Sequence, residues 1–136
     1  MTHNPLLGPV IVLVAWTLVM LVWTALVRAP FLKGGNVPAG SRGADLPPGP
    51  HTWPGHNYNH LHEQPTLFYA IVLALVAMGD QFAFNLYLAW AYVGLRIVHS
   101  IWQATKNVVR IRFALFALST LCLLALTLHA AMAFWH

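Results

Sequence analysis

The chain has 136 residues, of which 59% are hydrophobic and only 7% are charged. Soluble domains carry about a quarter charged residues, so this composition argues against an ordinary water-soluble domain. The net charge of +4 is scattered among apolar segments rather than collected in a patch, which favours a membrane protein over a nucleic-acid-binding protein. The single cysteine, Cys122, excludes an intrachain disulfide and lies in an apolar run, where we expect it to pack rather than to act as a nucleophile.

Four segments are apolar enough and long enough to cross a bilayer, which takes about 20 residues. In chain order, the expected spans are residues 6–27, 61–79, 82–104 and 113–135. The first span follows no Lys or Arg and its apolar stretch is longer than that of a signal peptide, so we expect it to remain in the protein. Short links join antiparallel neighbours. The predicted fold is therefore an all-α integral membrane protein, a bundle of four transmembrane helices forming one domain over residues 1–136.

The basic residues indicate the orientation of the bundle. Residues 28–56 hold six Gly and six Pro, which predicts an irregular loop. Every Lys and Arg except Arg96 lies in or beside this loop and the link after the third span: Arg28, Lys33, Arg42, Lys106, Arg110 and Arg112. The other face, which includes both termini, has none. The positive-inside rule therefore predicts that both connections are cytoplasmic and that both termini lie on the opposite side.

The third span carries polar residues that lipid cannot satisfy. At 100° per residue one helical stripe collects Tyr92, Arg96, His99, Ser100, Gln103 and Asn107, and Asn85 extends it. Such a stripe must face other helices or a wet cavity. One interpretation is that it only joins helices, and the other is a functional pocket, because an intramembrane Arg requires an anion. For Tyr92 we favour packing over a role as a functional phenol.

Glu63 is the acidic residue best placed to meet that stripe. If the second span is helical from His56 onward, then His56, His60 and Glu63 share one face. The simpler interpretation is a Glu63–Arg96 ion pair that holds the bundle together. The functional interpretation is a polar pocket that opens to the cytoplasm and is built from spans two, three and four.

The histidines admit two further interpretations. His51, His56, His60 and His62 lie within 12 residues, but they lack a standard metal-binding spacing, so no metal site is expected. A haem would need two histidines on facing helices at the same depth. His99 and His129 do not meet this condition, because His129 lies near the opposite face, which leaves His60 with His99 as the alternative pair.

Two motifs resemble those of the membrane-associated proteins in eicosanoid and glutathione metabolism (the MAPEG superfamily), particularly its bacterial branch. The first is "NYNHLHEQPTLFYA" at residues 57–70, where the family pattern is matched by Asn57, Leu61, Glu63, Pro65, Leu67, Phe68 and Tyr69. The second is "AWAYVGLRIVHSIWQATKNVVRIRF" at residues 89–113, where the family spacing is matched by Arg96, His99, Ser100 and Arg112. With the four-span organisation, the resemblance covers essentially the whole chain.

The resemblance implies a homotrimer in the bacterial inner membrane, with glutathione bound between adjacent subunits near the cytoplasmic face. By this likeness Glu63 receives the glutathione amino group, and Arg112 holds the thiol as a thiolate. The same cleft is lined by Arg96, His99 and Gln103, with His60 and Asn57 as further candidates. The implied activity is that of a glutathione transferase or peroxidase acting on hydrophobic electrophiles that enter from membrane lipid. The alternative is a non-catalytic lipid-binding or scaffold member of the family.

The chain departs from the family pattern at two places. Asn59 and His60 stand where the family usually has Arg and then Asn, and Gln103 stands where its enzymes often have Tyr or His. One contact to a glutathione carboxylate is therefore either missing or supplied elsewhere, by Arg28, Lys33 or His56. His60 is the difference at which altered function is first expected.

Overall fold

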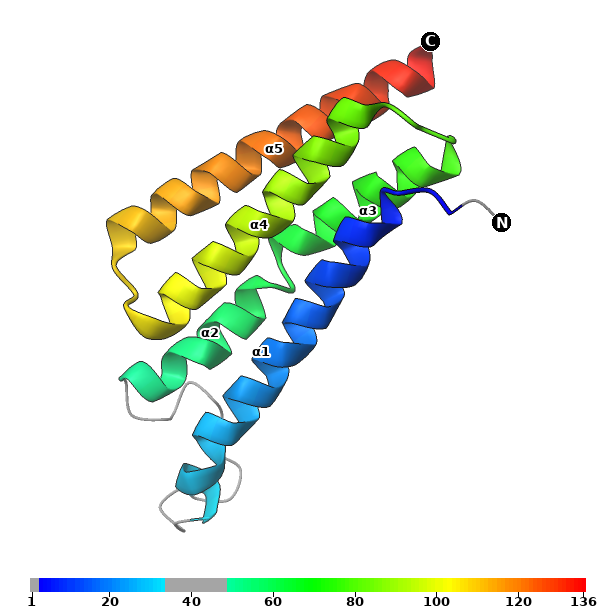
Figure 1. Ribbon diagram of the computed structural model, residues 1–136. Coiled ribbons are helices and arrows are strands. Elements are labelled where there is room, and N and C mark those ends of the chain that lie inside the picture. The colour runs from blue at the N-terminus through cyan, green and yellow to red at the C-terminus, as the bar shows by residue number, and fades with distance from the viewer. Residues whose placement is uncertain (1–2, 34–48) are drawn as a thin grey trace.

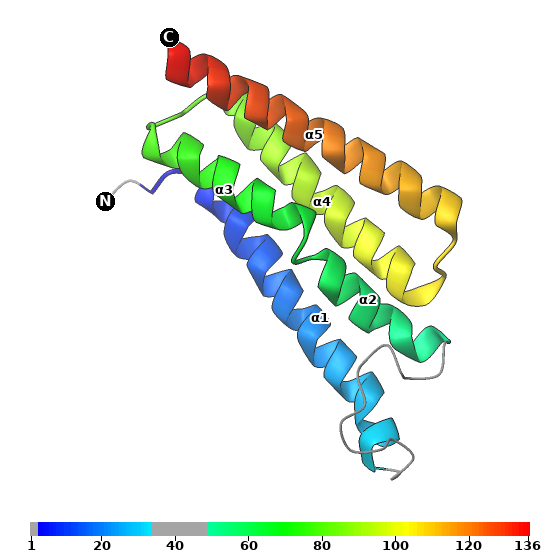
Figure 2. The same ribbon diagram turned by 180° about the vertical axis from the view of Figure 1, so that it is seen from behind.

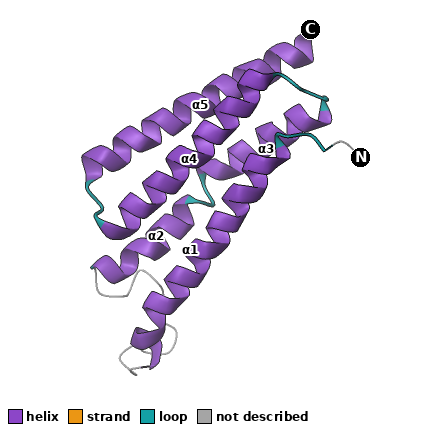
Figure 3. Ribbon diagram, in the orientation of Figure 1, coloured by secondary structure: helices purple, strands orange, loops and turns teal. Residues whose placement is uncertain are grey.

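A computed structural model describes residues 3–33 and 49–136, and this part of the chain is helical, with no strand. The elements are α1 (Leu7–Lys33), the short 3-10 helix η2 (Pro50–Thr52), α2 (Trp53–His60), α3 (Gln64–Ala77), α4 (Ala83–Thr105) and α5 (Val109–Trp135) (Figures 1 and 3). The all-α prediction is confirmed. Most of the predicted loop, with Arg42 and Asp45, lies outside the described residues.

The helices form an elongated bundle with two distinct ends. The antiparallel pair α4 and α5 lies on one side of the bundle and α1 on the other, with α2 and α3 in sequence between them (Figures 1 and 2). Both ends of the described chain lie at the end of the bundle that holds the α3–α4 connection. The last turn of α1, the start of α2 and the α4–α5 connection lie at the opposite end.

The outer surface of the bundle is largely apolar. Two helices are long and apolar enough to cross a membrane, α1 over Leu7–Pro30 and α5 over Val109–Trp135. Both expose large apolar side chains, such as Leu26 at 69% and Phe134 at 73%. A helix that is hydrophobic on all sides and yet exposed in the folded chain is suited to lipid. The other two expected spans correspond to α3, which has only 14 residues, and to α4, which carries the polar stripe.

The second expected span, residues 61–79, corresponds to α3, but the chain is not helical from His56 onward, which was the condition for His56, His60 and Glu63 to share one face. Helix α2 ends at His60, α3 begins at Gln64, and residues 61–63 form a turn. Pro65 lies in the first turn of α3. A proline has no N–H to donate to the preceding turn, and its ring clashes with the carbonyl four residues earlier, so a helix readily begins there but does not pass through unbroken.

The predicted loop over residues 28–56 is also shorter than expected. Helix α1 continues to Lys33, and η2 and α2 begin at Pro50 and Trp53, inside the predicted loop. Both of the later elements carry a proline at their first or second position. Two of the prolines that suggested irregular structure, Pro50 and Pro54, therefore act as helix starts, because a fixed φ near −65° is already suited to the first helical turn.

The core is a narrow seam along the bundle. The N-terminal part of the chain contributes Leu13 and Met20 from α1 and Leu6 from the turn just before it; the three are spaced seven residues apart and are almost completely buried. The Phe68 ring of α3 stacks on the Tyr92 ring of α4 with 4.3 Å between the ring centroids. Tyr92 is fully buried in this contact, in agreement with the packing role favoured for it.

A polar cluster joins the helices at the end that holds the termini. The Asn85 side-chain amide donates to an Asp80 carboxylate oxygen at 3.0 Å, and the Asn85 Oδ1 atom accepts from His129 Nδ1 at 2.5 Å. Because an amide oxygen can only accept, this contact assigns the hydrogen to Nδ1 of His129. The Asn4 side chain also donates to the Asp80 backbone carbonyl, at 3.0 Å. His129 thus has partners at this end, far from His99.

Candidate functional site

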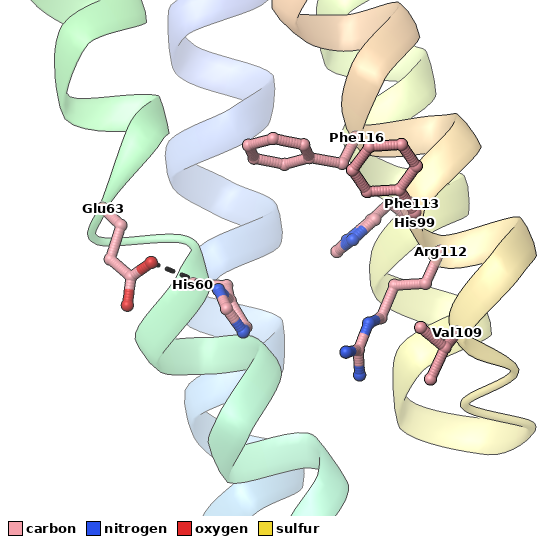
Figure 4. Close-up of a pocket in the computed structure, with 7 residues that line it drawn as sticks. All are labelled: His60, Glu63, His99, Val109, Arg112, Phe113 and Phe116. Carbon is pink, nitrogen blue, oxygen red and sulfur yellow. Dashed lines mark hydrogen bonds and ion pairs between the residues drawn. The ribbon is translucent and has the colours of Figure 1, made fainter.

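A pocket of about 290 Å³ lies near the bundle end that holds the α4–α5 connection. It is bounded by α2, the turn before α3, α4 and α5, and is lined by His60, Glu63, His99, Val109, Arg112, Phe113 and Phe116 (Figure 4). The figure shows His60 and Glu63 on one wall and the other lining residues on the facing wall. Acidic, imidazole and guanidinium groups therefore share a single cavity with two phenylalanine rings.

One wall of the pocket is an imidazole–carboxylate pair. The Nδ1 atom of His60 lies 3.2 Å from Oε2 of Glu63. A carboxylate only accepts, so His60 Nδ1 carries the hydrogen of this bond, and the other ring nitrogen, Nε2, is left for other partners. The two residues are brought together by the turn after α2, because Glu63 follows His60 by three positions.

The Glu63–Arg96 ion pair, which was the simpler interpretation of the sequence, does not form. Within residues 3–33 and 49–136 the one ion pair is His60–Glu63. The side chain of Glu63 is 66% exposed, whereas Arg96 is only 2% exposed. The physical reason is the helix break before Pro65, which removes Glu63 from the helical face that was expected to carry it toward Arg96.

The facing wall contributes Arg112, whose guanidinium is held from the α4–α5 connection. Its Nη1 donates to Oδ1 of Asn107 at 2.6 Å. Asn107 has a φ of 51°, in the left-handed region, and its N–H donates to the Trp102 carbonyl at 2.8 Å to end α4. Asn tolerates this conformation better than most residues. Asn107 therefore both terminates α4 and orients Arg112.

Arg96 lies behind the pocket and is held by neutral groups. Its Nη2 donates to Oε1 of Gln64, and its Nε donates to the Tyr92 hydroxyl at 3.3 Å. The guanidinium also lies over the Phe116 ring, 5.4 Å from the centroid. The Gln64 side-chain N–H group donates in turn to Thr120 at 2.8 Å, so this glutamine links α3 to both α4 and α5. No carboxylate in the described part of the chain contacts the Arg96 guanidinium.

The polar stripe of α4 faces the interior, as predicted. Six of its members are buried: Asn85, Tyr92, Arg96, His99, Ser100 and Gln103. Buried polar groups normally have hydrogen-bond partners. Three nearly inaccessible side chains nevertheless retain polar atoms without a partner, namely Asn57 on α2 (both atoms), Ser100 Oγ and Gln103 Oε1. The interior beside α2 and α4 is therefore polar beyond what the protein itself satisfies.

The structure brings together four of the seven predicted site residues, Arg112, His99, Glu63 and His60, in one pocket. The remaining three, Arg96, Gln103 and Asn57, are buried in the interior and do not line it.

The sequence did not predict the apolar lining of the pocket, which consists of Val109, Phe113 and Phe116. The signal that could have found the two phenylalanines is their spacing, because Phe113 adjoins Arg112 in the chain and Phe116, four positions after Arg112, lies near it on a helix. Nor did the sequence predict Gln64, for which no spacing rule existed.

The cluster of histidines does not converge. Among the described residues no group of three or more His, Cys, Asp or Glu side chains is arranged to hold a metal ion. His60 lines the pocket, whereas His62 lines a separate groove between α1 and the α2–α3 region. The Nδ1 atom of His62 donates a hydrogen bond to the Tyr58 carbonyl at 2.9 Å. Neighbouring histidines thus serve different surfaces.

The helical bundle, its lipid-suited surface and its charged terminal pocket together indicate a helical membrane protein. A family model, described as the MAPEG family, matches residues 6–132, which is nearly the whole chain. The chain therefore belongs to the MAPEG family, as its motifs predicted, and this family includes glutathione transferases and peroxidases. A search of curated proteins and a search of solved structures each found no match.

Proposed function

We propose that the protein is a membrane-bound glutathione transferase or peroxidase that activates the glutathione thiol for attack on hydrophobic electrophiles. The observation that carries this proposal is the convergence of Arg112, His99 and the Glu63–His60 pair in one pocket with two phenylalanine rings. Glutathione is a peptide with carboxylates and an amine, so its site requires cations and an acid together. The Phe113 and Phe116 rings supply the apolar surface that a hydrophobic electrophile needs.

Arg112 is the proposed activating residue. A free thiol has a pKa near 8.5, so little thiolate exists at neutral pH, and an adjacent fixed cation lowers that pKa. Glu63 receives the glutathione amino group, for which its Oε1 atom is available because Oε2 is bonded to His60. His99 lines the same cavity. Arg96, Gln103 and Asn57 act from behind it, Arg96 by adding positive potential.

The proposed assembly is a homotrimer of four-span subunits in the bacterial inner membrane, with the sites between adjacent subunits and no nucleic-acid partner. The exposed apolar side chains of α1 and α5 support contact with lipid or with neighbouring subunits. Arg28, Lys106, Arg110 and Arg112 belong to the helix ends around the pocket, whereas Asp80 lies at the end with the termini. By the positive-inside rule this distribution supports a cytoplasmic pocket and termini on the other side.

The test is to add glutathione to the purified, detergent-solubilised protein at neutral pH and to measure ultraviolet thiolate absorbance. We expect a thiolate signal that saturates with glutathione, together with conjugation of a generic aryl halide. Native mass spectrometry of the same sample reports the number of chains. The enzyme proposal is wrong if the folded protein produces neither thiolate nor conjugate.

A second candidate function is that of a non-catalytic lipid-binding or scaffold protein. It is favoured by an apolar groove of about 320 Å³ between α3 and α5, whose lining includes Ile71, Met78 and Phe134. Such a protein is expected to copurify with lipid and to leave the small thiolate fraction of added glutathione unchanged.

The Asn107–Arg112 contact yields a separate prediction about thiol activation. We expect Asn107→Asp to weaken the thiolate signal, because a carboxylate bonded to Arg112 cancels much of the charge that stabilises the thiolate. Asn107→Gly is the matched control, since glycine adopts the left-handed conformation freely and adds no charge. Thiolate absorbance as a function of pH measures the effect. Equal profiles for the two variants would contradict it.

A further inference from the structure

His60 and Glu63 form a unit whose chemistry differs from that of a simple ligand contact. The Glu63 carboxylate occupies Nδ1 of His60, which leaves Nε2 of the neutral ring as a free acceptor. The His60 ring extends from α2 on the pocket side, opposite the wall that bears His99 and Arg112 (Figure 4). A carboxylate that orients an imidazole in this way also stabilises the imidazolium formed when the ring accepts a proton.

We propose that His60, oriented by Glu63, is the catalytic base that takes the thiol proton. This inference rests on the proposed function. The S–H bond breaks, its electron pair stays on sulfur, and the proton forms an N–H bond at Nε2 of His60. The thiolate faces Arg112 on the other wall, and the imidazolium is paired with Glu63. After the thiolate attacks the electrophile, the imidazolium returns its proton to the leaving group or to water.

The neighbouring charges favour His60 over the other imidazole in the pocket. The groups that face His60 are Glu63 from the turn before α3, His99 from α4 and Arg112 from α5. His99 itself is 5% exposed and has Arg96 one turn before it on α4 and Arg112 in the same cavity. A cation forms more readily beside a carboxylate than between guanidinium groups, so the proton goes to His60.

The distinguishing experiment counts protons. Glutathione is added to the purified protein at neutral pH in weak buffer with a pH indicator, and thiolate absorbance is followed at the same time. In the wild-type protein we expect clearly less than one proton released to solvent per thiolate formed, because His60 retains it. In His60→Asn we expect one full proton released per thiolate. Asparagine suits this test because it can still donate to Glu63 but cannot take a proton.

The rate of conjugation provides a second measure. A positioned general base contributes about 10²- to 10⁴-fold, so we expect His60→Asn to lower kcat/KM at neutral pH by about 10²-fold. The deficit should shrink as the pH rises toward the pKa of the free thiol, where no base is needed. His62→Asn is the matched control, because it removes an imidazole two residues away that lines a different groove. It should retain the wild-type proton count and pH profile.

Glu63→Gln keeps the inference testable even if position 60 does not tolerate asparagine. As a positioning residue, Glu63 should affect kcat at saturating glutathione, whereas a role confined to the amino group would raise KM alone. Wild-type values of kcat in Glu63→Gln, or a wild-type proton count and rate in His60→Asn, would overturn the inference while leaving the proposed function intact. A wild-type protein that forms no thiolate overturns both.

Discussion

Replacing Arg112 with Ala should abolish most of the thiolate signal at neutral pH and lower kcat/KM for conjugation by about 10²-fold, the usual effect of losing one group that stabilises a developing anion. The reason is electrostatic. Arg112 is the guanidinium that lines the pocket, and its position is held by Asn107. Without it, the pKa of the bound thiol returns toward the free value near 8.5, so the thiolate appears only at higher pH. Thiolate absorbance measured from acid to alkaline pH shows this shift directly.

Arg110→Ala is the matched control for this prediction. It removes the same charge from the same turn of α5, but Arg110 is exposed and does not line the pocket. Its titration curve should therefore resemble that of the wild type. Arg112→Lys should fall between the two, because it keeps a charge but replaces the planar guanidinium, whose donors lie on separate nitrogens, with a single ammonium nitrogen. Identical curves for Arg112→Ala and Arg110→Ala would exclude Arg112 as the activating residue.

The second large effect is expected at Gln64. Changing Gln64 to Leu should lower the free energy of unfolding by about 2–3 kcal/mol, because the buried Arg96 guanidinium loses a hydrogen-bond acceptor. Leucine also cannot donate the hydrogen bond that Gln64 makes to Thr120, so the polar link from α3 to α5 is lost. Unfolding in mixed micelles of increasing denaturing detergent, followed by circular dichroism, measures the loss.

Two further variants separate this effect from a general loss of polarity. Gln81→Leu makes the same substitution at an exposed position in the α3–α4 connection and should change stability little. Gln64→Glu restores an acceptor for Arg96, this time charged, and should recover stability relative to Gln64→Leu. If all three variants unfold at the same detergent fraction, the Arg96–Gln64 contact contributes nothing to the stability of the bundle.

The fold class and the helical periodicity followed from local features of the sequence. The residues of α4 show this best, because the stripe from Asn85 to Gln103 was read from a 100° rotation per residue and is buried in the structure. The positions of Arg112, His99 and Glu63 in one pocket agree with the residues that the family motifs selected. Periodicity and motifs are properties of short stretches, so one sequence carries them in full.

The tertiary structure decided the pairings. The sequence suggested an ion pair between Glu63, as the acid, and Arg96, as the buried cation. In the structure Glu63 instead contacts His60. Arg96 donates to Gln64 and Tyr92. The break before Pro65 redirects the side chains on either side of it, and a continuous helical projection cannot represent that change.

The sequence by itself thus determined that this protein is a helical membrane protein of the MAPEG family, and its motifs selected four of the residues that line the pocket. Only the tertiary structure decided which of those residues meet. The choice between two acceptors for Arg96 depends on distances of a few ångströms, and those are set by the packing of α3 against α4 and α5 rather than by spacing along the chain.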